Sequence, residues 1–150
     1  MESAQKIKTR IMTYGEFITA LRLRHFKAWE LTSYADRVSG GVKNSEPPAS
    51  LWENIVVPLW CLDCLRESLG RPITIVSTFR SVRYNATLNG AVSNSQHLRN
   101  CAIDFKVKGM RPATAFDRLR VMRDAKIFRG GLGLYPTFVH IDNRGRCATW

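Results

Sequence analysis

The chain has 150 residues, of which 45% are hydrophobic, and it carries a formal net charge of +11 from 23 Lys and Arg against 12 Asp and Glu. This length suits one domain with its own core, and the hydrophobic content excludes a disordered chain. No apolar run approaches the roughly 20 residues of a membrane span, and the basic N-terminus lacks the apolar segment of a signal peptide. We therefore expect a single domain over residues 1–150, made in the cytoplasm without a signal peptide or transmembrane segment.

Predicted helices fill the first half of the chain. They cover residues 14–24, 27–38 and 50–69, and residues 39–48 between them form a loop rich in turn residues. Thr13 can cap the first helix, which belongs to a helical N-terminal extension formed by residues 1–24. Ser50 can cap the third helix and Gly70 can end it, while Pro58 should bend it locally.

Predicted strands dominate the second half. They cover residues 73–79, 102–107, 130–135, 137–142 and 146–150, with helices over residues 83–88 and 112–125. Helices followed by mostly antiparallel strands are typical of an α+β domain rather than of a doubly wound parallel sheet. We therefore predict a central, mostly antiparallel sheet with helices packed on it.

The excess of positive charge predicts a polyanionic partner, which could be nucleic acid, an anionic membrane surface or an anionic cell wall. Composition does not choose among these partners. The sequence has no helix-turn-helix, zinc-finger or RNA-binding signature, so no nucleic-acid partner is expected.

The four cysteines are Cys61, Cys64, Cys101 and Cys147. Cys61 and Cys64 form a CxxC pair inside a helical pattern, and no second pair follows at zinc-finger spacing. We therefore interpret them as small buried apolar residues, and we expect no disulfides in a chain without an export signal.

Two of the three histidines lie in segments that also carry carboxylates. His97 precedes Asp104 by seven positions, and His140 and Asp142 share one face of a predicted strand. If the two strands are neighbours, His97, Asp104 and His140 converge on one point. Two imidazoles and one carboxylate suit a zinc ion with an open position, as catalytic zinc requires. The third histidine, His25, is expected on the surface of a helix.

These segments carry a resemblance to a known family. Ser95, His97, Ala102 and Asp104 stand at the spacing of the SxHxxGxAxD signature of the M15-type zinc D-Ala-D-Ala carboxypeptidases. The closing segment from residue 130 to residue 150, with Gly-Gly-Leu-Gly-Leu-Tyr and His-Ile-Asp, is similar to the branch of small phage lysins and murein endopeptidases. Similar elements recur upstream, so the resemblance covers the chain from about Phe26 onward.

The resemblance implies a hedgehog/DD-peptidase-like fold and one catalytic domain that hydrolyses peptide bonds in peptidoglycan. In such a peptidase His97, Asp104 and His140 would bind zinc. Arg80 would bind a substrate carbonyl or carboxylate and stabilise the oxyanion, and Ser95 would bind substrate or fix the loop. A phage-type lysin, expected as a monomer, would act on the anionic cell-wall surface after its release from the cytoplasm.

Two positions depart from the family pattern. The glycine of the signature is Asn100 here, and asparagine tolerates the left-handed backbone conformation better than most residues. Many members of the family have an acidic residue three positions before the second zinc histidine. This chain has Thr137 there, which cannot deprotonate water. Asp142 is the available carboxylate on the same strand. We expect it to act either as the general base or as the group that orients a metal ligand. A purely structural role in a turn or salt bridge is the alternative for Asp142.

Two questions about function stay open at the level of sequence. The replacement at Thr137 allows a catalytically inactive zinc-binding domain of the same fold, as hedgehog-type domains show that this scaffold can serve binding. The same zinc ligands also serve both carboxypeptidase and endopeptidase chemistry, so the scissile bond is not predicted.

Overall fold

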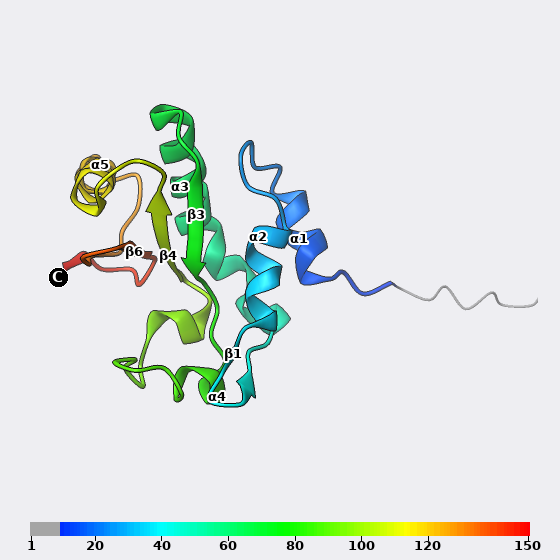
Figure 1. The fold of residues 1–150 in the computed structure, drawn as a ribbon. Coiled ribbons are helices and arrows are strands. Elements are labelled where there is room, and N and C mark those ends of the chain that lie inside the picture. The colour runs from blue at the N-terminus through cyan, green and yellow to red at the C-terminus, as the bar shows by residue number, and fades with distance from the viewer. Residues whose placement is uncertain (1–9) are drawn as a thin grey trace, which may run out of the picture.

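A five-stranded sheet is the centre of the computed structural model, which describes residues 10–150 (Figure 1). Its strands are β3 (Ile73–Ser77), β4 (Ala102–Val107), β5 (Gly131–Leu134), β6 (Val139–Asp142) and β7 (Ala148–Thr149). They lie in the order β3-β4-β6-β5-β7, and only the pairing of β5 with β7 is parallel. The predicted α+β class with a mostly antiparallel sheet is therefore confirmed.

Two helices cover one face of this sheet. They are α3 (Val56–Leu69) and α5 (Pro112–Asp124), which contact each other and β4; α3 lies behind β3 and β4 in the view of Figure 1. Side chains alternate along β4, so Ile103 and Phe105 join the apolar core while Asp104 points to the opposite face. The sheet thus has one face for the core and one for polar chemistry.

The shorter elements pack around the sheet. They are α1 (Tyr14–Ala20), α2 (Trp29–Thr32), α4 (Val82–Asn85), the 3₁₀ helices η1 (Ser33–Asp36), η2 (Ala49–Ile55) and η3 (Gln96–Arg99), and the hairpin of β1 (Val38–Ser39) and β2 (Val42–Lys43). The predicted cap of α1 is confirmed, because Thr13 and Glu16 form a reciprocal capping box. Tyr14 and Ile18 of α1 are buried in the core, while residues 1–9 of the predicted extension lie outside the described residues.

Several predicted helix boundaries are wrong. The helix expected over residues 27–38 divides into α2 and η1, and the β1–β2 hairpin occupies the end of that stretch and the first part of the loop predicted over residues 39–48. Ser50 is not a cap, because the chain enters as the 3₁₀ helix η2 with Pro48 before it. Pro58 lies in the first turn of α3, where backbone N–H groups have no carbonyl partner within the helix. The N–H that proline lacks is therefore not missed, and the proline does not interrupt this helix. Gly70 does end α3, with a φ of 60°.

The interpretation of the CxxC pair as buried apolar residues is confirmed for Cys61 and only in part for Cys64. Cys61 is buried in the core, and burial raises the pKa of its thiol to about 12. Cys64 is half-buried, and all four cysteines are free thiols. His25 lies between α1 and α2, rather than on a helix, where its ring pairs with Glu67.

Within residues 10–150, no helix combines the length and the apolar character that crossing a membrane requires.

Asn100 connects the loop of the polar face to the helices. It ends η3 with a φ of 55° and is fully buried. Its side-chain amide donates to the carbonyl of Leu51 at 3.1 Å and lies 3.5 Å from the hydroxyl of Tyr14. The left-handed conformation expected at this position is confirmed, and asparagine adds an anchor that a glycine could not supply.

We expect Asn100→Ala to destabilise the protein by about 2 to 3 kcal/mol, because it combines left-handed strain with the loss of a buried hydrogen bond. Asn100→Gly should cost about 1 kcal/mol less, because glycine adopts a positive φ without strain. Urea denaturation of both variants gives the two free energies of unfolding. Equal losses would show that the backbone conformation at residue 100 contributes nothing.

Candidate metal centre and active site

The pairing of β4 with β6 builds the polar face of the sheet. In this antiparallel register Asp104 lies opposite His140, and Ala102 lies opposite Asp142. His97 comes from η3, the turn that leads into β4. Its loop is tied to the end of β3, since the backbone N–H of Arg80 donates to the carbonyl of His97 at 3.1 Å. The three predicted ligands therefore reach one place from two strands and a loop.

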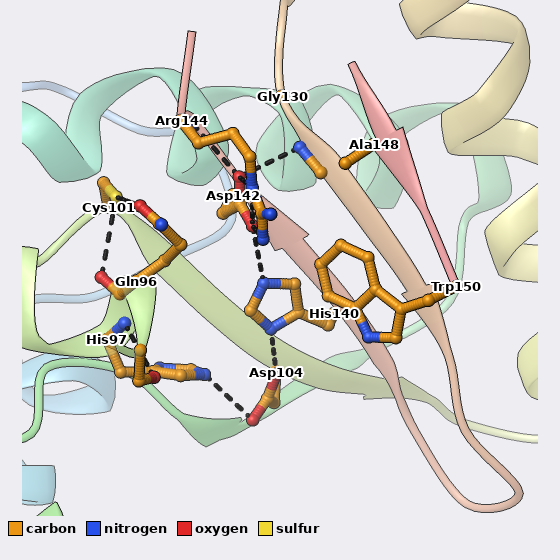
Figure 2. Close-up of polar contacts among 12 residues, drawn as sticks. Gln96, His97, Cys101, Asp104, Gly130, His140, Asp142, Arg144, Ala148 and Trp150 are labelled. Carbon is orange, nitrogen blue, oxygen red and sulfur yellow. Dashed lines mark hydrogen bonds and ion pairs between the residues drawn. The ribbon is translucent and has the colours of Figure 1, made fainter. Parts of the chain in front are cut away.

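His97, Asp104 and His140 are all buried, and their ligand atoms lie within 4.8 Å of one another. The Nε2 atom of His97 is 3.1 Å from Oδ2 of Asp104, and the Nδ1 atom of His140 is 2.8 Å from Oδ1. Figure 2 shows the Asp104 carboxylate between the two imidazoles. The predicted cluster is thus brought together around one carboxylate.

The protonation of His97 can be worked out from its surroundings. Its Nδ1 atom lies 2.7 Å from the carbonyl of Thr78, which can only accept, so Nδ1 carries the proton. Burial lowers the pKa of His97, although Asp104 acts in the opposite direction. A neutral ring in this tautomer points the lone pair of Nε2 at the carboxylate of Asp104.

This donor set fits a divalent cation. A lone pair and a carboxylate oxygen at 3.1 Å repel each other unless a cation lies near both of them. Burial alone would raise the pKa of Asp104, but its contact with His140 holds it well below the ordinary value. Two imidazole nitrogens and one carboxylate oxygen are the ligands of catalytic zinc sites.

Asp142 lies behind His140 rather than beside the ligand cluster (Figure 2). Its carboxylate is fully buried and 2.9 Å from Nε2 of His140. The backbone N–H of Gly131 donates to it at 2.9 Å, and the guanidinium of Arg144 binds it through Nε and Nη2, with a shortest distance of 2.6 Å. Although burial would raise the pKa of Asp142, these hydrogen bonds lower it strongly. Asp142 is a fixed anion with its hydrogen-bonding positions in use.

Arg80 and Ser95 take different positions in the site. Arg80 donates through Nη2 to Asp104 at 3.2 Å and through Nε to Ser77 at 3.0 Å, so its guanidinium lies beside the ligand cluster. Ser95 caps η3, and its hydroxyl accepts from the backbone N–H of His97 at 3.3 Å. Ser95 therefore fixes the loop that carries His97.

A cavity of about 810 Å³ opens over the cluster. Arg80, Ser95, His97, Asp104 and His140 line it, together with Arg144, Arg146 and an aromatic group formed by Tyr135, Phe138 and Trp150. Among the described residues that line it, Asp104 is the one acid, whereas Asp142 and Thr137 do not reach it. Positive charge and aromatic rings therefore surround the cluster.

Sequence analysis did not identify three contributors to this site. These are the carbonyl of Thr78, the guanidinium of Arg144 and the indole of Trp150. A backbone carbonyl leaves no signal in a sequence. Arg144 and Trp150 stand in the closing segment, but their spacing from His140 does not predict a contact with it.

Comparison with known proteins agrees with this geometry. The sequence model described as Peptidase M15 matches residues 24–142. A stretch of 85 residues is 34% identical to a protein of Haemophilus influenzae named as a probable peptidoglycan L,D-endopeptidase MepK. That match covers 52% of this chain and 42% of the relative, so the chain matches about two fifths of the relative's length. Because the family model matches well over half of the sequence, the chain belongs to the Peptidase M15 family.

Proposed function

We propose that this chain is a zinc-dependent peptidase that hydrolyses peptide bonds in peptidoglycan, in its stem peptides or cross-links. The observation that carries the proposal is the meeting of His97, Asp104 and His140 at the base of a large cavity. Membership of a peptidase family and the name of the relative support the same reaction and substrate.

In this proposal His97, Asp104 and His140 hold the metal ion. A zinc ion there would supply a Lewis acid that polarises a carbonyl oxygen and lowers the pKa of water. Thr78 keeps the proton of His97 on Nδ1, so that Nε2 remains free to bind a metal. Asp104 stays ionised, since its pKa lies well below the ordinary value.

Arg80 is the residue that we assign to the substrate. Its guanidinium lines the cavity beside Asp104, where a carbonyl or carboxylate of a peptide would meet its N–H groups. The same donors would stabilise negative charge that develops on the carbonyl oxygen during hydrolysis. Ser95, which caps η3, supports this site by fixing the loop of His97.

Sequence analysis left three roles open for Asp142, namely general base, orienter of a metal ligand and purely structural residue, and its contacts support the second one. A general base must reach the water that it deprotonates, but Asp142 is fully buried and does not line the cavity. It instead accepts a hydrogen bond from Nε2–H of His140, which leaves Nδ1 directed at Asp104. We therefore assign Asp142 to the orientation of His140.

The substrate class follows from charge as well as from the relative. The net charge of +11 and the arginines of the cavity suit an anionic cell wall. The relative is named as an endopeptidase, which favours cleavage within a cross-link over removal of a terminal residue. We further propose that the chain acts as one catalytic domain and as a monomeric, phage-type lysin.

A catalytically inactive zinc-binding domain is the second candidate. One observation favours it, namely that Asp104 is the one acid among the described residues that line the cavity. Asp104 is a proposed metal ligand, so it is not free to act as a general base. Binding of wall peptides without hydrolysis would then be the function of the cavity.

Purified peptidoglycan separates these two candidates. We expect the chain to release soluble fragments, to lose this activity with a chelator and to regain it with zinc. His97→Ala should abolish the release, whereas His25→Ala should not, because His25 lies elsewhere and pairs with Glu67. Mass spectrometry of the fragments identifies the bond that is cut. Tight zinc binding without cleavage of any wall type would favour the inactive domain.

Substitution of Arg80 tests the role of its guanidinium. We expect Arg80→Ala to lower kcat by about 100-fold, because the oxyanion loses a charged donor in the cavity. Arg83→Ala is the matched control, since Arg83 is an exposed arginine on α4 and does not line the cavity. Hydrolysis of a soluble muropeptide, followed by chromatography, gives kcat for both variants. Equal kcat values for the Arg80 variant and the unaltered chain would contradict the assignment.

A further inference from the structure

We propose that Arg144 and Trp150 are positioning residues that fix the orientation of His140, an inference that rests on the proposed role of His140 as a zinc ligand. Arg144 acts through the carboxylate of Asp142. Trp150 acts by packing against both Arg144 and His140. Together with Asp142 they form a clamp on the side of His140 that faces away from Asp104.

The contact between Arg144 and Asp142 is the first part of the clamp. The Nε atom of Arg144 lies 2.9 and 3.1 Å from the two carboxylate oxygens, and Nη2 lies 2.6 Å from Oδ2. A guanidinium that binds a carboxylate through two nitrogens fixes its plane as well as its position. Since Oδ2 is also the atom that meets Nε2 of His140, the plane of this carboxylate sets the direction of the imidazole.

Trp150 is the second part. Its ring lies 4.7 Å from the guanidinium carbon of Arg144, and its centroid is 5.2 Å from that of the His140 ring. The indole N–H donates to the hydroxyl of Tyr135 at 2.9 Å, and its backbone N–H and carbonyl pair with β5. Trp150 is 45% exposed, yet hydrogen bonds and aromatic contacts hold it on several sides. Figure 2 shows its ring beside the imidazole of His140.

Two glycines of β5 make room for the clamp. A Cβ atom on Gly131 would lie 2.5 Å from Oδ2 of Asp142 and 3.0 Å from two nitrogens of Arg144. A Cβ atom on Gly133 would lie 2.7 Å from Nε1 of Trp150. Any larger residue at either position would displace the carboxylate, the guanidinium or the indole. Close approach of side chains thereby explains Gly131 and Gly133 in the glycine-rich motif of the closing segment.

A double-mutant cycle on zinc affinity tests whether Arg144 acts through Asp142. Zinc affinity of the full chain is measured by competition with a chromophoric chelator for Asp142→Asn, Arg144→Gln and the double variant. We expect each single change to weaken zinc binding by about 10- to 100-fold. The double variant should be no weaker than the weaker single variant, because both changes remove one shared contact.

Control variants distinguish loss of the His140 orientation from unfolding of the chain and from a change of net charge. Arg120→Gln removes one positive charge from an exposed ion pair with Asp117 and should leave zinc affinity unchanged. Trp150→Ala should weaken zinc binding, whereas Trp60→Ala, at a 50% exposed tryptophan, should not. Thermal melting of the metal-free variants shows that each one is folded. If Arg144→Gln fails to fold, comparison of the double variant with Asp142→Asn keeps the test valid, because neither leaves a buried carboxylate unpaired. The inference expects equal zinc affinity for these two variants, and a weaker double variant would overturn it.

Rescue by lysine gives a further readout. Arg144→Lys keeps the charge but lacks the planar fork, so zinc affinity should recover only in part. Affinity of Arg144→Gln equal to that of the unaltered chain, or effects of the two single changes that multiply in the double variant, would overturn the inference alone. An unaltered chain that binds no zinc would overturn the proposed function, and the inference with it.

Discussion

The site depends on the register between β4 and β6. Antiparallel pairing places Asp104 directly opposite His140, and the same register directs Ile103 and Ile141 into the core on the other face. A slip by one residue would exchange the two faces, burying carboxylate and imidazole among apolar helices. The hydrophobic core under α3 and α5 therefore selects the register that also assembles the polar cluster. The pairing of β4 with β6 therefore determines both the packing of the core and the geometry of the site.

The buried charges of the polar face form two groups that meet at His140. Asp104 contacts His97, His140 and Arg80, and Asp142 contacts His140 and Arg144. A carboxylate taken out of water needs such partners, because an unpaired buried charge is costly. His140 lies between the two anions, so a shift of either carboxylate changes the orientation of the same imidazole. This coupling makes Asp142, which does not line the cavity, relevant to a metal ligand that does.

Sequence patterns predicted the parts of this structure that local alternation determines. The strand over residues 102–107 and the sharing of one face by His140 and Asp142 follow from the two-residue period of a strand. The predicted start of the α-helix at Ser50 was wrong, because the chain turns earlier, as the 3₁₀ helix η2, and Ser50 makes no cap hydrogen bond. The contact of Arg144 with Trp150 could not be predicted, because it requires β7 to lie beside β5 in the parallel register.

The glycines that make room for the clamp lower the stability of strand β5. Half of its four residues are Gly131 and Gly133, and glycine weakens a strand because it loses more backbone entropy and offers no side chain to pack. Its pairing with both β6 and β7 offsets this weakness, and Leu132 supplies a fully buried side chain to the core. Alanine at either glycine would favour the strand itself but would meet Asp142 or Trp150 at less than contact distance. A sequence selected for strand stability alone would not place glycines there, so the space that they leave is best understood as part of the site.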